Sequence, residues 1–179
     1  MNGVLEVIID RCLGCHTCEL ECAVAHSRKS KTLVETVYNR ERVYPRIILE
    51  VDGDDVIPMH CRHCTNAPCI AVCPTTAMSR AGVGEPVVLN LRECIGCNAC
   101  VIACPFGVIR AIPGRKALAK CDLCVDRLEE GNIPACAAGC PTQAIRFTQL
   151  EDITAERRAE TIREFRVSMV QSAEPGNSK

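Results

Sequence analysis

Short apolar segments, separated by polar turns, recur along the first 150 residues of the chain. Residues 4–10 are apolar and β-branched and predict a strand. Residues 45–51 and 56–59 flank an Asp-Gly-Asp-Asp turn and predict a hairpin. Further short strands are expected at 86–89, 107–112, 117–120 and 144–148.

Helical segments in this region are equally short. One helix is expected over residues 18–27, and others are expected just after Cys69 and Cys100. Residues 28–44 are polar and charged and are interpreted as an insertion. The alternation of small strands and helices predicts an α+β fold.

The last thirty residues have a different pattern, charged and helical. Thr154 is the expected N-cap of a helix that runs to about residue 166. Its apolar stripe is narrow, with Ile162, Phe165 and Met169 at helical spacing. This helix either packs on its own domain or docks a partner or another copy, and residues 172–179 are expected to be disordered.

Composition changes this picture because 16 of the 179 residues are cysteine, while aromatic residues are only 3% and Trp is absent. Something other than large side chains is therefore expected to fill the interior. The formal charge of −1 gives no basic excess that would indicate nucleic acid.

The cellular compartment is predicted from the start of the sequence and from the length of its apolar stretches. No export signal is visible at the start, and the apolar stretch 100–109 is interrupted by Pro105 and Gly107. It is also far shorter than the roughly 20 residues of a membrane span. We expect a soluble cytoplasmic protein without membrane insertion, in which a reducing environment disfavours disulfides.

The sixteen cysteines form four quartets, and none is left over. The first and third have the spacing C-x2-C-x2-C-x3-C, the second has C-x2-C-x4-C-x3-C, and the fourth has C-x2-C-x11-C-x3-C. The quartets are Cys12, Cys15, Cys18 and Cys22; Cys61, Cys64, Cys69 and Cys73; Cys94, Cys97, Cys100 and Cys104; and Cys121, Cys124, Cys136 and Cys140.

This spacing is typical of bacterial two-cluster ferredoxins, in which the last cysteine of a run binds the neighbouring cluster. Four quartets therefore predict four 4Fe–4S clusters with all sixteen cysteines as iron ligands. Zinc is the weaker alternative, because zinc sites usually use two separated pairs of cysteines. A Rieske site is not expected, since the cysteine count is complete without histidine.

Basic side chains lie beside several of these cysteines. His16 and His63 are placed inside cysteine loops, where they could donate to a cluster sulfur, although solvated or packing roles are the more common alternative. Four cations adjoin ligands and either offset cluster charge or are simply exposed: Arg11, Arg62, Arg92 and Lys120. No catalytic constellation stands out in the sequence.

With four quartets in this order, residues 1–150 resemble the four-cluster electron-transfer subunits of oxidoreductase complexes. These include the iron–sulfur subunits of formate dehydrogenase, carbon monoxide dehydrogenase, dimethyl sulfoxide and nitrate reductases, formate-linked hydrogenases and tungsten aldehyde oxidoreductases. The likeness is carried by the run CLGCHTCELECAVAHS at 12–27, by Cys61-Arg62-His63-Cys64 and by Ala67-Pro68-Cys69. One departure is Ala23, where the other quartets have proline after their last cysteine.

The resemblance implies that the first quartet pairs with the fourth and the second with the third. Two ferredoxin-like modules related by a pseudo-twofold axis would result, one from residues 1–44 and 113–150, the other from 45–112, followed by a C-terminal helix and tail at 151–179. The implied ligand sets are Cys12, Cys15, Cys18 and Cys140; Cys22, Cys121, Cys124 and Cys136; Cys61, Cys64, Cys69 and Cys104; and Cys73, Cys94, Cys97 and Cys100.

The resemblance also implies a non-catalytic electron wire, possessing no substrate chemistry of its own. The expected partner is a catalytic subunit: a molybdenum or tungsten enzyme, a carbon monoxide dehydrogenase or a hydrogenase. A flavin- or NAD-linked subunit and self-association through the C-terminal helix are further expectations. A free-standing polyferredoxin shuttle and a zinc-binding regulator stay open as alternatives.

Overall fold

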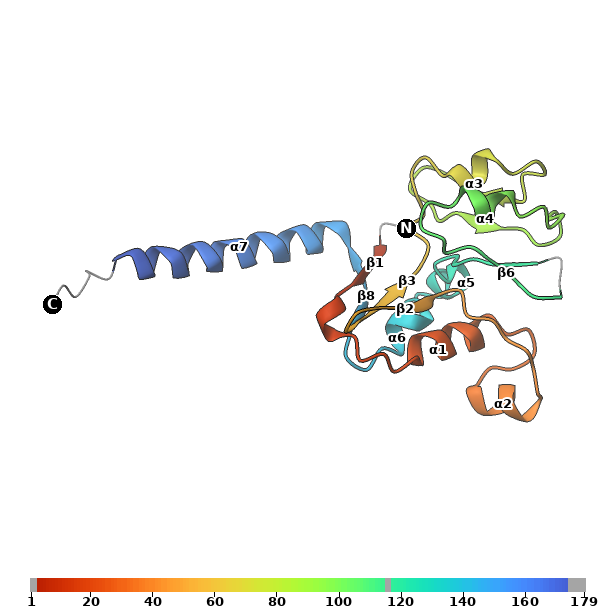
Figure 1. Ribbon diagram of the computed structural model, residues 1–179, viewed down its shortest axis with the longest axis horizontal. Helices are drawn as coiled ribbons and strands as arrows, with labels where there is room; N and C mark the ends of the chain where they lie inside the picture. The colour runs from red at the N-terminus through yellow and green to blue at the C-terminus, as the bar shows by residue number, and fades with distance from the viewer. Residues whose placement is uncertain (1–2, 115–116, 174–179) are drawn as a thin grey trace. The chain divides into compact units, whose positions relative to one another are not determined.

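The protein is built from four small two-stranded sheets and short helices, an α+β architecture (Figure 1). The computed structural model describes residues 3–114 and 117–173, with side chains of the last helix described as far as residue 167. Within these residues each sheet is a pair: β1 (Gly3–Val7) with β8 (Ile145–Gln149), β2 (Ile48–Asp52) with β3 (Asp55–Met59), β4 (Met78–Ser79) with β5 (Val88–Leu89), and β6 (Arg110–Ala111) with β7 (Leu118–Ala119).

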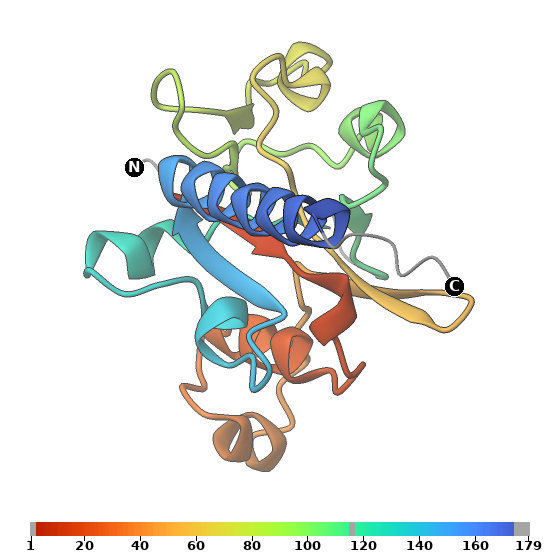
Figure 2. The ribbon, with the colours of Figure 1, turned by 90° about the vertical axis from the view of Figure 1, so that its left-hand side faces the viewer.

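The helices lie between the strands and are also short. They are α1 (Thr17–Ala25), α2 (Leu33–Tyr38), α3 (Pro68–Ala71), α4 (Ala99–Ala103), α5 (Val125–Glu129), α6 (Ala135–Ala138) and α7 (Leu150–Ala173), with a 3-10 turn at Ile9–Arg11. Helix α1 packs against α6, as the views in Figures 1 and 2 also show, and α3 packs against α4. Each packed pair thus joins segments from different cysteine quartets.

Most predicted strands and helices are present with narrower bounds. The antiparallel register of β2 and β3 pairs Asp52 with Asp55 across the turn, as expected of the hairpin. The strand expected over 4–10 ends at Val7, because Ile9–Arg11 turn into a 3-10 helix before the first cysteine. Additional elements not expected from the sequence are β4, α5 and α6.

Helix α2 lies inside the segment interpreted as a polar insertion. The Thr32 side chain accepts a hydrogen bond from the Glu35 N–H at 3.1 Å, and the Glu35 carboxylate accepts one from the Lys31 N–H at 2.7 Å. These two bonds resemble a capping box, except that the Glu35 carboxylate bonds to the residue before the N-cap and not to the N-cap itself. The Thr-x-x-Glu pattern at 32–35 was the available signal for this helix.

The C-terminal helix begins earlier than expected. Helix α7 starts at Leu150, directly after β8, so Thr154 is not its N-cap. The Thr154 hydroxyl instead donates to the Glu151 carbonyl at 2.9 Å from within the first turn. Ile162 and Phe165 are exposed, whereas the Met169 side chain and the tail at 174–179 lie outside the described residues.

Cysteines make up much of the interior of the unit formed by residues 5–147. One buried cluster packs Cys18, Cys22 and Cys136 with Leu5 and Ile145. A second packs cysteines with apolar side chains of the middle of the chain: Cys69, Met78, Val87, Cys100, Ile109 and Leu118. The interior is therefore arranged around thiols, as the shortage of aromatic residues indicates.

Candidate iron–sulfur centres

The first candidate centre is a small cavity lined by cysteines from the first and the last quartet. Its lining includes three cysteines of the first quartet and the last cysteine of the fourth: Cys12, Cys15, Cys18 and Cys140. Leu49, Pro58 and Ile145 close its apolar side. Residues 128 positions apart in the chain thus face the same space.

The second cavity is built in the same way from the middle of the chain. Its cysteines are Cys61, Cys64, Cys69 and Cys104. Pro68, Val87 and Ile109 are among the apolar side chains around them. Helix α3 places Cys69 at this cavity, while Cys104 follows directly after α4.

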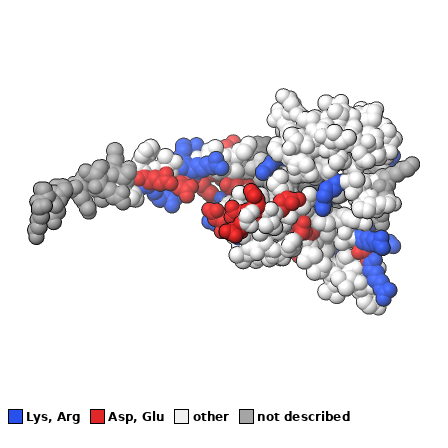
Figure 3. Space-filling model, in the orientation of Figure 1, with Lys and Arg blue, Asp and Glu red and all other residues white. Residues whose placement is uncertain are grey.

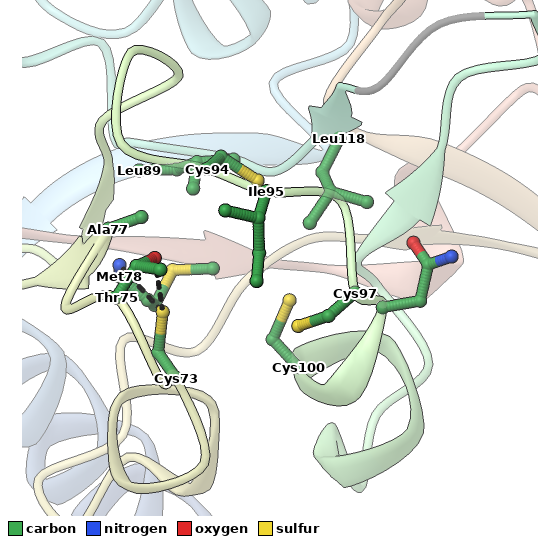
Figure 4. Close-up of a pocket in the computed structure, with 11 residues that line it drawn as sticks. Cys73, Thr75, Ala77, Met78, Leu89, Cys94, Ile95, Cys97, Cys100 and Leu118 are labelled. Carbon is green, nitrogen blue, oxygen red and sulfur yellow. Dashed lines mark hydrogen bonds between the residues drawn. The ribbon is translucent and has the colours of Figure 1, made fainter.

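The third cavity is shown in Figure 4. Its cysteines are Cys73, Cys94, Cys97 and Cys100. Met78, Leu89 and Leu118 supply much of the apolar wall, and Ile95 projects among the sulfurs. Cys97 is exposed, so this centre lies near the surface.

The remaining cysteines are all buried: Cys22, Cys121, Cys124 and Cys136. Burial raises the pKa of the Cys136 thiol, and Cys22, Cys121 and Cys124 are close enough to raise it further by charge repulsion. The Cys136 thiol would thus resist becoming a thiolate by itself. An iron cluster removes this obstacle, because a metal ion deprotonates the thiols that bind it.

The cysteine loops share a backbone device. The residue just before the second cysteine of every quartet has positive φ: Gly14 at 63°, His63 at 46°, Gly96 at 73° and Leu123 at 63°. In two loops the N–H of that residue donates to the sulfur of the first cysteine, from His63 to Cys61 at 3.4 Å and from Leu123 to Cys121 at 3.5 Å. A left-handed turn therefore wraps the backbone around the sulfur, and such N–H···S bonds help to set cluster potentials.

Proline after the last cysteine of a quartet ends the local helix. Where proline is present, as at Pro74, Pro105 and Pro141, α3, α4 and α6 end before the cysteine. Ala23 replaces this proline in the first quartet, and α1 continues past Cys22 to Ala25. His26 consequently lies one helical turn after Cys22, with its ring beside that cysteine.

His26 is the centre of a partly buried ionic network at the all-buried centre. Its Nδ1 donates to the Cys22 carbonyl at 2.7 Å, and its Nε2 donates to the Asp122 carboxylate at 3.0 Å. The same ring nitrogens lie 3.7 Å from Cys22 Sγ and 4.0 Å from Cys124 Sγ. Arg46 also donates to Asp122, and its backbone N–H donates to Cys22 Sγ at 3.3 Å.

This network keeps its charges despite burial. Burial alone would lower the pKa of His26, but its hydrogen bonds, led by the bond to Asp122, together outweigh burial and raise that pKa to about 12. Burial would likewise raise the pKa of Asp122, yet His26 and Arg46 hold it well below its usual range. Sequence reasoning did not single out His26, although its position four residues after Cys22 was the signal for it.

The histidines considered from the sequence behave differently. His16 is exposed and pairs with Glu19 at 2.7 Å, while its ring also borders the first cavity. The His63 Nδ1 accepts the Val87 N–H at 2.9 Å, so this nitrogen is not a donor to a cluster sulfur. Burial and the charge of Lys120 lower the pKa of His63 to about 3, so its ring is neutral at pH 7.

The four cations beside ligands also divide into two kinds. Arg11, Arg62 and Arg92 are exposed. Lys120 is buried, and its Nζ donates to the carbonyls of Val87 at 2.5 Å and Cys121 at 2.7 Å. Of these four cations, only the three arginines are exposed to solvent, and the lysine is buried.

The donor set fits iron–sulfur clusters. Each of the three cavities offers four sulfurs within an apolar lining, and backbone N–H groups already point at several sulfurs. Hydroxyl groups two residues after a ligand add to this, since Thr75 lies 3.8 Å from Cys73 Sγ and Thr142 lies 3.8 Å from Cys140 Sγ. Among the described residues, no helix has the length and apolarity that a membrane span requires.

Comparison with known proteins gives consistent matches. The family model described as a 4Fe-4S dicluster domain matches residues 54–150. An iron-sulfur protein of Rhodospirillum rubrum is 40% identical over 163 residues, covering 84% of each chain. The electron transport protein HydN of Escherichia coli (strain K12) is 37% identical over 179 residues, covering 90% of this chain and 98% of HydN.

Other matches differ in length or kind. The thiosulfate reductase electron transfer subunit PhsB of Salmonella typhi is 36% identical, covering 82% of this chain and 76% of PhsB. The chain spans only 24% of UacF and 25% of AegA, two longer Escherichia coli proteins. A chain of the active site complex BamBC of benzoyl coenzyme A reductase aligns over 94% of this chain with 17% identity and a TM-score of 0.43.

The matching model covers more than half of the chain, and relatives of similar length are named iron-sulfur or electron transport proteins. The chain therefore belongs to the ferredoxin-type electron-transfer family that carries the 4Fe–4S dicluster domain.

Proposed function

We propose that this chain holds four 4Fe–4S clusters and conducts electrons between a catalytic redox subunit and a second donor or acceptor. The observation that carries the proposal is the grouping of the sulfurs. Three cavities are each lined by four cysteines drawn from two quartets, and the other four cysteines are buried. When bound, each cluster would accept and release one electron.

The proposed ligand sets follow this grouping. They are Cys12, Cys15, Cys18 and Cys140; Cys61, Cys64, Cys69 and Cys104; Cys73, Cys94, Cys97 and Cys100; and Cys22, Cys121, Cys124 and Cys136. The corresponding modules are residues 1–44 with 113–150 and residues 45–112. Packing of α1 on α6 and of α3 on α4 supports this division.

One packed cluster of side chains between the proposed modules contains cysteines of two centres. Cys61 of the second cavity and Cys121 of the all-buried centre pack in one cluster with Val108 and, at its edge, Met59 and Cys104. Apolar packing excludes water from this contact. We propose that electrons cross from one module to the other here.

The substrate chemistry is proposed to reside in a partner. PhsB is named as the electron transfer subunit of a thiosulfate reductase. For this chain we propose a cytoplasmic complex with a molybdenum or tungsten enzyme, a carbon monoxide dehydrogenase or a hydrogenase, and a flavin- or NAD-linked subunit as a further partner. The chain alone should then show no activity on formate, aldehyde or carbon monoxide.

Cluster number is tested by anaerobic purification with iron and sulfide analysis. The expected result is about 16 iron and 16 sulfide per chain, with the spectroscopic signature of reduced 4Fe–4S clusters. About half these values, or zinc in place of iron, would contradict the proposal. Cys22→Ser and Cys18→Ser should perturb different clusters, and a perturbation of the same cluster would reject the ligand sets.

The partner is tested by native size analysis and mass spectrometry of what copurifies with the full chain. A catalytic subunit is expected in the same peak, whereas an isolated monomer would favour a free shuttle. Self-association through α7 is tested by ending the chain at Gln149. An unchanged assembly size in that variant would reject it.

A further inference from the structure

Lys120 is a fully buried cation whose recorded partners are both backbone groups. It follows β7 and directly precedes Cys121, and its side chain belongs to a residue that is only 3% exposed. Its ammonium donates to the carbonyls of Val87 and Cys121. Across the part of the chain whose side chains are described, no carboxylate forms an ion pair with it. Carbonyl dipoles alone compensate a buried charge poorly, so an anionic group nearby is expected.

Two candidate centres adjoin this ammonium, because its carbonyl partners belong to Val87 of the second cavity and to Cys121 of the all-buried centre. Its positive charge lowers the pKa of Cys69, which lines the second cavity, and the pKa of Cys121, which belongs to the all-buried centre. In both thiols burial is the larger effect and acts in the opposite direction. Val87, which holds the ammonium, also lines the second cavity, and Cys121 packs on Cys61.

The corresponding positions in the other quartets set Lys120 apart. The residues that directly precede the first cysteine are Arg11, His60, Glu93 and Lys120. Arg11 and Glu93 are exposed. His60 is buried, but burial lowers its pKa, and its Nδ1 hydrogen bonds to the Cys61 carbonyl at 2.9 Å. Lys120 is thus the buried charge among these four equivalent residues.

We propose that the Lys120 ammonium is a positioning charge shared by the second cavity and the all-buried centre, where it raises the reduction potentials of the two clusters on either side of it. This inference rests on the proposed function. A fixed cation in a low-dielectric interior favours the more negative, reduced state of a nearby cluster. The two carbonyl bonds hold the charge in place, so its effect is greatest at the contact between the proposed modules.

The test uses the full chain, loaded anaerobically, with potentials measured by redox titration followed by electron paramagnetic resonance. Lys120→Met removes the charge, and Lys120→Gln removes it while keeping a hydrogen-bond donor. Arg11→Met is the matched control, because Arg11 also directly precedes the first cysteine of a quartet but is exposed. Lys120→Arg keeps the charge.

Both neutral variants should lower two of the four potentials by about 59 mV or more, a tenfold change in the one-electron reduction equilibrium. Arg11→Met should change each equilibrium less than threefold, and Lys120→Arg should restore the two potentials. Equal shifts of all four clusters, or a shift no larger than in Arg11→Met, would overturn the role of Lys120.

Iron and sulfide analysis of each sample distinguishes a failure of the Lys120 inference from a failure of the proposed function. Fewer than four clusters in the wild-type chain would overturn the proposed function. Four clusters in every variant without the selective shift would overturn the Lys120 inference alone. If only Lys120→Arg among the three Lys120 variants still loads four clusters, the charge is required for cluster loading and the inference about potentials falls. If Lys120→Arg also fails, the side chain is structural and the inference falls.

Discussion

The all-buried centre and the third cavity each group four cysteines, but the two groups differ in burial and in nearby charge. At the all-buried centre, Cys22 and Cys136 are enclosed, and His26, Asp122 and Arg46 add an ionic network. At the third cavity, Cys97 is exposed, and two-residue strands form the nearby sheets. In the view of Figure 3, few charged residues cover the part of the molecule that contains α3 and α4.

The difference comes from single positions rather than from the cysteine spacing. The first and third quartets have identical spacing, but Ala23 lets α1 continue where Pro105 ends α4. The extra turn brings His26 to Asp122. Equivalent motifs can therefore be given different burial and electrostatics by a residue that touches no iron, and four experiments test this contrast.

Complete removal of iron should have the largest effect. The buried clusters of side chains are built around cysteines, so the chain without metal should lose its cooperative unfolding transition. Under a chelator, iron should leave the third cavity about tenfold faster than it leaves the all-buried centre. This ratio corresponds to a free energy of local opening that is about 1.4 kcal/mol lower at the third cavity. Iron release followed by absorbance checks this, and a single uniform rate would remove the contrast.

Ligand replacement should be the next largest effect. Cys136→Ser places a polar hydroxyl in the enclosed centre and should destabilise the folded protein by about 3 kcal/mol or more. Cys97→Ser, its matched control, replaces an exposed ligand and should leave a folded chain with three unaltered clusters. Thermal unfolding and iron content are measured for both variants. Equal losses of stability in the two variants would contradict the expected effect of burial.

Asp122→Asn breaks the ionic network without removing a ligand. His26 and Arg46 then lack their counter-ion, and the expected loss in free energy of unfolding is about 2 kcal/mol. Asp126→Asn is the control, because Asp126 is exposed on the following helix. Denaturant unfolding of the iron-loaded proteins measures both, and equal effects would show that the network contributes nothing.

Arg80→Met should have the smallest effect. Arg80 donates to the carbonyls of His63 at 3.0 Å and Cys64 at 2.6 Å and so holds the second cysteine loop. Loss of these bonds should cost about 1 kcal/mol. Arg92→Met, at an exposed side chain, is the comparison, and chelator-accessible iron gives the readout. An effect larger than that of Asp122→Asn would contradict the expected order of these two contributions.

Local signals accounted for much of the fold. The hairpin at 48–59 follows from a Gly-containing turn between β-branched segments, and the helices beside Cys18, Cys69 and Cys100 follow from cysteine spacing. The N-cap predicted at Thr154 was wrong because β8 passes directly into α7, so the helix begins at Leu150, before Thr154 is reached. The capping pattern at Thr32 was overlooked in a segment rich in charge.

Contacts between distant residues were beyond local reasoning. Nothing around Lys120 in the sequence indicates burial, since Val87, which accepts its hydrogen bond, lies 33 residues away. The same holds for Asp122, which meets His26 across 96 residues. The ligand sets inferred from the resemblance stay predictions until cluster analysis tests them.

The distance along the chain between Cys12 and Cys140 also orders events during synthesis. The cysteines that line the second and third cavities all fall within residues 61–104, so they leave the ribosome within a few seconds of one another at about 5–20 residues per second. The cavity that contains Cys12 is completed only when Cys140 and β8 emerge and β8 pairs with β1. With the proposed ligand sets, the middle of the chain would therefore receive its iron while the first cysteines, already outside the ribosome, wait for the last.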